Sequence, residues 1–269
     1  MNSIKTLLFM GFFILKINVI FAHTDNIETK LMQKNDSMVL TAFNNLIIPI
    51  ELVAYLRSDD SIYGEYLIPA NSAIDIMTFE LEDKTIISDG IKEKYRFTYY
   101  FGDPANIFHD DSYVYRLPFK EGKKYRVSQS QNGKFTHNSD KSRFAIDFRL
   151  KVGDPVHAAR EGLVVRIQDK FKEHGGKKFI KKANFIMIQH GDGTISSYIH
   201  LDYKGVLVDV GDHVEKGQLI GYSGLTGFTR GPHLHFVVHK QKSISVPIFF
   251  EGYENLVLKK GKKYKILKK

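Results

Sequence analysis

The chain has 269 residues, of which 43% are hydrophobic, enough to form the core of a globular protein with one or two domains. It contains no cysteine, which excludes disulfides and thiolate metal sites and leaves His, Asp and Glu as metal ligands. The net charge of +9 comes from Lys5 and Lys16 near the start and from the seven lysines of residues 259–269. The neutral remainder argues against a basic nucleic-acid-binding face.

The first 22 residues have the pattern of an export signal. Lys5 gives a positive start, residues 6–15 form an apolar run, and Ala22 is a small residue at a plausible cleavage point. Lys16 interrupts the apolar stretch, which is short for a membrane span. We therefore predict a cleaved signal peptide at residues 1–22 and export to the periplasm or cell envelope. Secretion and an uncleaved anchor are the alternatives.

Short runs rich in β-branched and aromatic residues follow, with turn residues between them. They predict a β-sandwich-like module at residues 23–117, with a polar lead-in at 26–37. Pro49 pushes the second run toward a sheet edge, and residues 88–90 are interpreted as a turn. The histidine and acids at 109–111 are interpreted as a solvated loop. The predicted strands are residues 38–43, 46–56, 62–68, 74–81 and 95–101.

A second domain is predicted at residues 118–258, after a boundary near Leu117 and Pro118. Its recurring glycines separate short strands, which indicates a β-rich domain without amphipathic helices. The polar loop at 171–182 is expected to border a cleft. The basic tail at 259–269 is either a solvated end or a segment attracted to an anionic envelope surface. The predicted strands are residues 144–150, 163–168, 185–189, 194–201, 206–210 and 219–222.

A His-x-His pair, His233 and His235, lies in an apolar run after Gly231 and Pro232. On a strand, residues two apart point to the same face, so the two imidazoles would enter one space. Neutral imidazole suits zinc. A surface strand with two unimportant histidines is the alternative.

Three other residues are candidates to complete such a site. These are His137, Asp147 in an apolar run, and His200, which on a strand would share a face with Tyr198. A buried carboxylate needs a partner, so Asp147 binds either a metal or a cation in a salt bridge. The remaining histidines, at positions 157, 174, 190, 213 and 239, are expected in turns or at the surface.

Several ordered motifs resemble the lysostaphin/LytM-type zinc metallopeptidases, which are peptidoglycan endopeptidases. Residues 147–156 (DFRLKVGDPV) and 158–164 (AAREGLV) resemble the first signature of that family, and residues 198–201 (YIHL) resemble the middle one. Residues 211–221 (GDHVEKGQLIG), 224–227 (GLTG) and 231–236 (GPHLHF) resemble the third. The resemblance covers residues 125–250 and implies a β-rich peptidase domain with a duplicated hybrid motif.

The resemblance implies that His137, Asp147 and His235 bind zinc, while His200 and His233 act beside the metal. In such a site zinc activates a water molecule, one histidine takes its proton, and the other stabilises the oxyanion. The chain departs from the family in having nine residues between His137 and Asp147, where three are usual.

The implied function is an exported zinc metalloendopeptidase that cuts peptide cross-links of bacterial peptidoglycan. The bond would be D-alanyl-diaminopimelate or a glycine bridge, with the first favoured for a periplasmic enzyme. The alternative is a non-catalytic LytM-like regulator of other wall hydrolases, a class whose members lack the zinc ligands.

Overall fold

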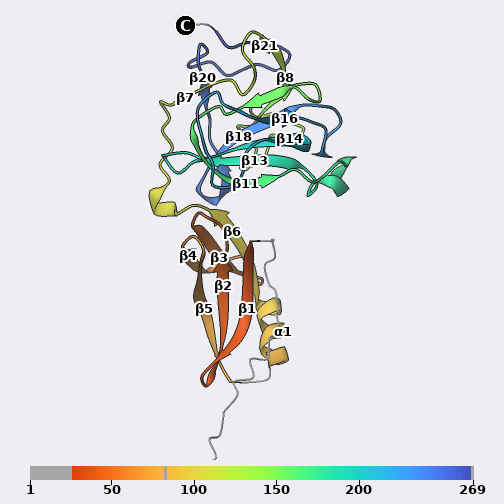
Figure 1. Ribbon diagram of the computed structural model, residues 1–269. Helices are drawn as coiled ribbons and strands as arrows, with labels where there is room; N and C mark the ends of the chain where they lie inside the picture. Colours follow the sequence, from red (N-terminus) through yellow and green to blue (C-terminus); the bar gives the residue numbers. More distant parts are fainter. Residues whose placement is uncertain (1–25, 82–83, 268–269) are drawn as a thin grey trace, which may run out of the picture.

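The structure is a computed structural model that describes residues 26–81 and 84–267 (Figure 1). An N-terminal module and a larger C-terminal domain lie end to end, and both consist mainly of strands. The predicted mainly β fold is therefore confirmed. The predicted signal peptide lies outside the described residues. Within those residues, no helix has the length and apolar character needed to cross a membrane.

The N-terminal module contains two three-stranded antiparallel sheets that share one core. Buried side chains from both sheets, such as Leu40 and Leu52, belong to the same cluster. One sheet has the order β1 (Ile27–Lys34), β2 (Ser37–Asn44) and β5 (Ser72–Glu80). The other has the order β4 (Ile62–Ile68), β3 (Ile50–Leu56) and β6 (Tyr95–Phe101).

Two segments of this module differ from the sequence prediction. The expected polar lead-in is strand β1, in which Ile27, Thr29 and Leu31 are buried and alternate with half-exposed residues. The expected turn at residues 88–90 lies inside helix α1 (Lys84–Lys94). Ile87 and Ile91 are four residues apart and both buried, so this spacing fixes one helical face on the core.

Pro49 does not place its strand at an edge. Strand β3 begins after it, at Ile50, and pairs with β4 on one side and β6 on the other. The proline therefore removes no hydrogen bond from the ladder, and the edge prediction was wrong because the strand is shorter than the apolar run.

The C-terminal domain is built around an eleven-stranded sheet (Figure 1). Its main path is β15 (His213–Val214), β11 (Gly162–Gln168), β13 (Asn184–Gln189), β14 (Ile195–Val206), β18 (Leu234–Lys240), β9 (Ile146–Arg149), β8 (Tyr125–Gln129) and β21 (Lys263–Tyr264). Strands β10 (Pro155–His157), β16 (Leu219–Ser223) and β19 (Ile244–Ser245) pair at its sides.

Two short parallel pairs complete the strands, namely β7 (Val114–Tyr115) with β20 (Phe249–Phe250) and β12 (His174–Gly175) with β17 (Gly227–Phe228). Three 3-10 turns are present, η1 (Pro104–Asn106), η2 (Lys177–Phe179) and η3 (Gln241–Ser243). As expected, the described residues of this domain contain no α-helix.

The two faces of the large sheet have different partners. Phe148, Tyr198 and Phe236 point into the core of the C-terminal domain. Val165 and Ile195 point the other way and belong to the core of the N-terminal module. The module is therefore packed on the sheet, and Lys242 Nζ also donates to Glu65 Oε1 at 2.7 Å across the junction.

The C-terminal domain begins earlier than the predicted boundary. Tyr115 and Leu117 are buried in its core, and β7 pairs with β20 near the end of the chain. Leu117 and Pro118 therefore lie inside this domain, and the connection between the two parts runs through η1 and the loop after it.

The basic tail is part of the fold through residue 267, so the separate tail predicted at residues 259–269 was wrong for these residues. Strand β21 pairs with Tyr125 and Arg126 of β8, and the Tyr264 side chain is only 7% exposed in the main core. The Lys259 backbone N–H donates to the Tyr264 hydroxyl at 2.8 Å. Tyr264 therefore anchors a segment whose described lysines are exposed.

Replacing that anchor is expected to destabilise the C-terminal domain. Tyr264→Ala removes a buried ring and leaves a cavity, so the free energy of unfolding should fall by about 3 kcal/mol. Lys265→Ala, an exposed neighbour, should change it by less than about 0.5 kcal/mol. Urea unfolding followed by circular dichroism measures both. Equal stability of the two variants would contradict the anchoring role of Tyr264.

Candidate functional site

His137 lies in the loop between β8 and β9 and is fully buried. Its Nδ1 lies 2.9 Å from the Ser130 carbonyl oxygen, so Nδ1 carries the proton and donates it. Its Nε2 is buried and makes no hydrogen bond to any described residue. This leaves an imidazole lone pair oriented into the site, the way a histidine is prepared to bind a metal.

Asp147 and His235 are placed side by side by strand pairing. Strands β9 and β18 are antiparallel neighbours, and Asp147 is directly opposite His235 in their register. His235 Nδ1 lies 2.8 Å and His137 Nε2 lies 3.2 Å from the same Asp147 Oδ1. The three potential ligand atoms all lie within 4.8 Å of one another.

Asp147 is held in its ionised form. Burial alone would raise the pKa of its carboxyl group, but the close His137 and His235 imidazoles, together with the charge of His235 when protonated, lower that pKa far below its usual value. The pKa of His137 is raised, because interaction with the Asp147 carboxylate outweighs the cost of burial. A carboxylate among two imidazoles is a donor set that suits zinc.

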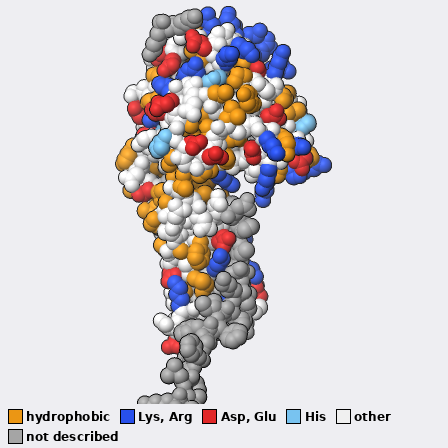
Figure 2. Space-filling model, viewed as in Figure 1, with side chains coloured by type: hydrophobic (Ala, Val, Ile, Leu, Met, Phe, Trp, Pro, Cys, Tyr) orange, Lys and Arg blue, Asp and Glu red, His pale blue; other side chains and the backbone are white. Residues whose placement is uncertain are grey.

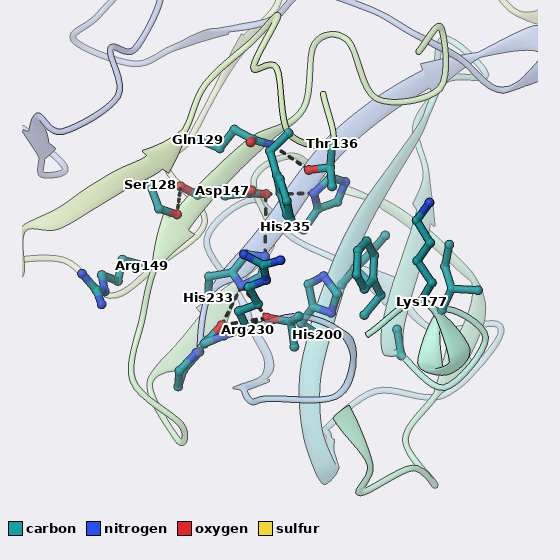
Figure 3. A pocket seen from close by; sticks show the side chains of 18 residues that line it. Ser128, Gln129, Thr136, Asp147, Arg149, Lys177, His200, Arg230, His233 and His235 are labelled. Carbon is teal, nitrogen blue, oxygen red and sulfur yellow. Dashed lines mark hydrogen bonds and ion pairs between the residues drawn. The ribbon is translucent and has the colours of Figure 1, made fainter. Parts of the chain in front are cut away.

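His200 and His233 lie beside this group (Figure 3). Their ring centroids are 4.6 Å apart, and that of His200 is 6.2 Å from His235. His233 Nε2 lies 3.9 Å from Asp147 Oδ1. The expected placement of His233 and His235 in one space is therefore seen in the structure, although His233 lies just before β18 begins.

His200 reaches the site through an irregularity in β14. The register of β14 against β13 shifts beside it, and His200 has a φ of 70°, which is uncommon for a non-glycine residue. On a regular strand it would follow Tyr198 into the core. The shift turns it to the opposite face, so the expectation that it shares a face with Tyr198 was wrong.

A hydrogen bond sets the tautomer of His200. Its Nδ1 lies 2.6 Å from the Thr226 carbonyl oxygen and donates to it, which leaves Nε2 as the basic atom. Burial, together with the nearby His233 and His235, lowers the pKa of His200 to about 3. The ring is neutral at pH 7 in this arrangement.

The five residues line or adjoin a cleft of about 820 Å³. Lys177 and Ile180 form part of its wall, so the prediction that the loop at 171–182 borders the cleft is confirmed. Arg230 packs over the ring of Phe135, 5.1 Å from its centroid, at the rim. Sequence reasoning did not identify Phe135 and Arg230 as lining residues, because they come from two loops far apart in the chain.

The nine residues between His137 and Asp147 form an ordered loop. Ser142 Oγ donates to the Thr136 carbonyl oxygen at 2.6 Å, and Ser245 Oγ donates to the Asp140 carbonyl oxygen at 2.6 Å. Arg143 is paired with Asp140 at 2.8 Å. These contacts bring His137 back to Asp147 despite the longer spacing.

Residues 141–247 match the model of Peptidase family M23. The C-terminal domain is therefore similar to members of this family. The match includes Asp147, His200, His233 and His235, while His137 lies four residues before it. The recognition made from the sequence motifs is therefore confirmed at the level of the family.

Three curated relatives are similar to part of this chain. An "Uncharacterized metalloprotease" of Buchnera aphidicola is 34% identical over 55% of this chain and 37% of its own length. "Peptidoglycan DD-endopeptidase ShyA" of Vibrio cholerae is 34% identical over 42% of this chain and 24% of its own length. "Glycyl-glycine endopeptidase ALE-1" of Staphylococcus capitis is 38% identical over 35% of this chain and 23% of its own length. The chain thus spans less than two fifths of each relative.

Two of the remaining histidines, which were expected in turns or at the surface, are at least partly buried. His190 is 3% exposed, its Nδ1 donates to the Glu161 carbonyl oxygen at 2.7 Å, and its buried Nε2 lacks a hydrogen bond among the described residues. His239 is half-buried, and its Nε2 lies 2.8 Å from the Lys141 carbonyl oxygen. His190 directly follows strand β13, and His239 lies within strand β18, so each adjoins apolar residues of the large sheet.

His190 is expected to make the fold sensitive to acid. Burial, and secondarily the nearby Arg160 charge, lower its pKa to about 4 from 6.5. The folded state therefore resists protonation, and stability present above pH 6.5 is lost as the pH falls toward 4. His190→Asn should make the free energy of unfolding less dependent on pH between 6.5 and 4. Urea unfolding at several pH values measures this, with exposed His213→Asn as the control. An unchanged pH dependence would contradict a neutral, buried His190.

Proposed function

We propose that the chain is a zinc metalloendopeptidase in which His137, Asp147 and His235 bind the metal. The observation that carries the proposal is the buried Nε2 of His137, which makes no hydrogen bond to a described residue and faces the Asp147 carboxylate beside His235 Nδ1. A buried polar atom without a partner is costly, and a metal ion would remove that cost. Two nitrogens and one carboxylate oxygen leave a coordination position open, as in catalytic zinc sites.

When bound, zinc supplies Lewis-acid polarisation of a peptide carbonyl and lowers the pKa of a coordinated water. The protein supplies proton transfer and charge stabilisation. His200 and His233 both have Nδ1 bound to a backbone carbonyl oxygen, of Thr226 at 2.6 Å and of Gly231 at 2.9 Å. Each ring is thereby fixed with Nε2 free for chemistry. The Nε2 of one histidine would accept the proton of the attacking water. The other ring, when protonated, would stabilise the negative charge that develops on the peptide carbonyl oxygen.

We propose peptide cross-links of bacterial peptidoglycan as the substrate. Support comes from the M23 domain and from relatives whose names specify DD-endopeptidase and glycyl-glycine endopeptidase activities. The start of the chain supports export, so that the enzyme would meet this substrate in the periplasm or cell envelope. With that location we favour the D-alanyl-diaminopimelate bond over a glycine bridge. The regulatory alternative loses support, because its defining feature is a missing ligand set.

One experiment should distinguish the proposed metal ligands from the proposed catalytic histidines. His235→Ala and His137→Ala remove a metal ligand, so zinc content and muropeptide cleavage should fall together. His200→Ala and His233→Ala leave the three ligands in place, so zinc should remain while kcat falls by about 10²- to 10⁴-fold. The measurements are zinc per chain by elemental analysis and the rate of muropeptide cleavage.

His213→Ala serves as the control because His213 is exposed on β15, outside the site. It should keep both zinc and rate. Loss of zinc from His233→Ala as complete as that from His235→Ala would overturn the assignment of ligands. A wild-type chain without zinc and without cleavage would overturn the proposed function itself.

A further inference from the structure

A second groove, of about 640 Å³, lies next to the cleft and is lined mainly by cationic side chains. They come from β8, β9, β21 and the adjoining loops, and they are Lys123, Lys124, Arg126, Arg149, Lys151 and Lys263. Figure 2 shows Lys and Arg side chains gathered over the end of the molecule that carries β8 and β21. Arg149 and Pro232 line both this basic groove and the cleft, so the two spaces adjoin.

Three of these cations stand in register across neighbouring strands. Lys263 of β21 is opposite Arg126 of β8, and Arg126 is opposite Arg149 of β9. All three are exposed. Like charges directly opposite one another destabilise a sheet. The arrangement is therefore unfavourable for the fold alone and becomes favourable when an anion lies across it.

The protein itself does not neutralise this row. Asp154 is the one acidic residue among those that line the basic groove. Its Oδ1 accepts from Lys123 Nζ at 3.3 Å and its Oδ2 from the Lys151 backbone N–H at 2.8 Å. Among the described residues, Arg126, Arg149 and Lys263 have no ion-pair partner.

The row begins at the metal-ligand group. Arg149 is two residues after Asp147 on β9, so both side chains lie on the same face of the strand. Two strand spacings, from Arg149 to Arg126 and on to Lys263, span roughly 10 Å, the length of about three residues of extended peptide. A peptide bound in the cleft and extending past Arg149 would therefore run along these cationic side chains.

We propose that the basic groove binds the free carboxylates of the substrate peptide on one side of the scissile bond. The inference rests on the proposed peptidoglycan substrate and gives it a chemical preference: a stem peptide with ionised carboxylates, rather than a neutral or amidated one. Arg126 and Lys263 act as substrate-binding residues outside the catalytic group, and Arg149 joins the two spaces.

Direct binding tests the proposal independently of turnover. The probes are a synthetic stem tetrapeptide with free carboxylates and its fully amidated copy, titrated calorimetrically into the full chain. Arg126→Gln/Lys263→Gln should raise the Kd of the acidic peptide about 3- to 10-fold, as expected for two exposed charge contacts. Binding of the amidated copy should not change, and the effect should shrink at high salt.

Two further variants serve as controls. Lys84→Gln/Lys94→Gln removes the same charge from α1 of the N-terminal module and should leave both Kd values unchanged. Arg126→Lys retains the charge and should keep binding within about twofold of wild type. The unfolding free energy of the double variant should be equal to or higher than that of wild type, since like-charge repulsion is relieved.

Equal effects on the acidic and amidated peptides, or no effect on either, would overturn the proposal. It would also be overturned if the double variant loses binding to vesicles of phosphatidylglycerol and phosphatidylcholine but keeps binding to the acidic peptide, because the groove then serves a lipid surface. Selective peptide binding by a chain that cleaves no muropeptide would support the groove and refute the proposed activity, so the two failures are distinguishable.

Discussion

The site depends on the antiparallel pairing of β9 with β18. Their register sets Asp147 directly opposite His235, and a shift by one residue would turn one of the two toward the core face. The buried neighbours Phe148 and Phe236 fix that register, because both must point into the same hydrophobic core. The stability of the core and the geometry of the ligand group therefore have one physical origin.

The other histidines of the candidate site lie on irregular backbone near Asp147 and His235. His200 is turned to the site face by the register shift in β14, with a φ of 70° that its surroundings hold in place. His137 comes from a loop and is oriented by the Ser130 carbonyl oxygen. Backbone carbonyl oxygens bind Nδ1 of His137, His200 and His233, so that each ring has a defined tautomer before any ligand enters.

The face of the sheet that carries the site also carries the N-terminal module. Val165 and Ile195 pack into the module's core, while Ile199 and His235 lie in the wall of the cleft. At the other end of the same sheet, β21 extends the surface with Lys263 beside Arg126. The N-terminal module, the group of His137, Asp147 and His235, and the basic groove therefore lie at different positions along the same large sheet.

The β-rich class, most strands and the resemblance to the M23 family could be predicted from the sequence, because they rest on local alternation, glycine spacing and short motifs. The sequence also named the five residues that the structure brings together at the candidate site. Tertiary structure alone decided that His200 leaves the face of Tyr198, that His190 is buried, that Ile87 and Ile91 belong to a helix, and that Tyr264 anchors the tail. These outcomes depend on packing between segments far apart in the chain. The cationic row of Lys263, Arg126 and Arg149 is of the same kind, since only strand order brings its three members together.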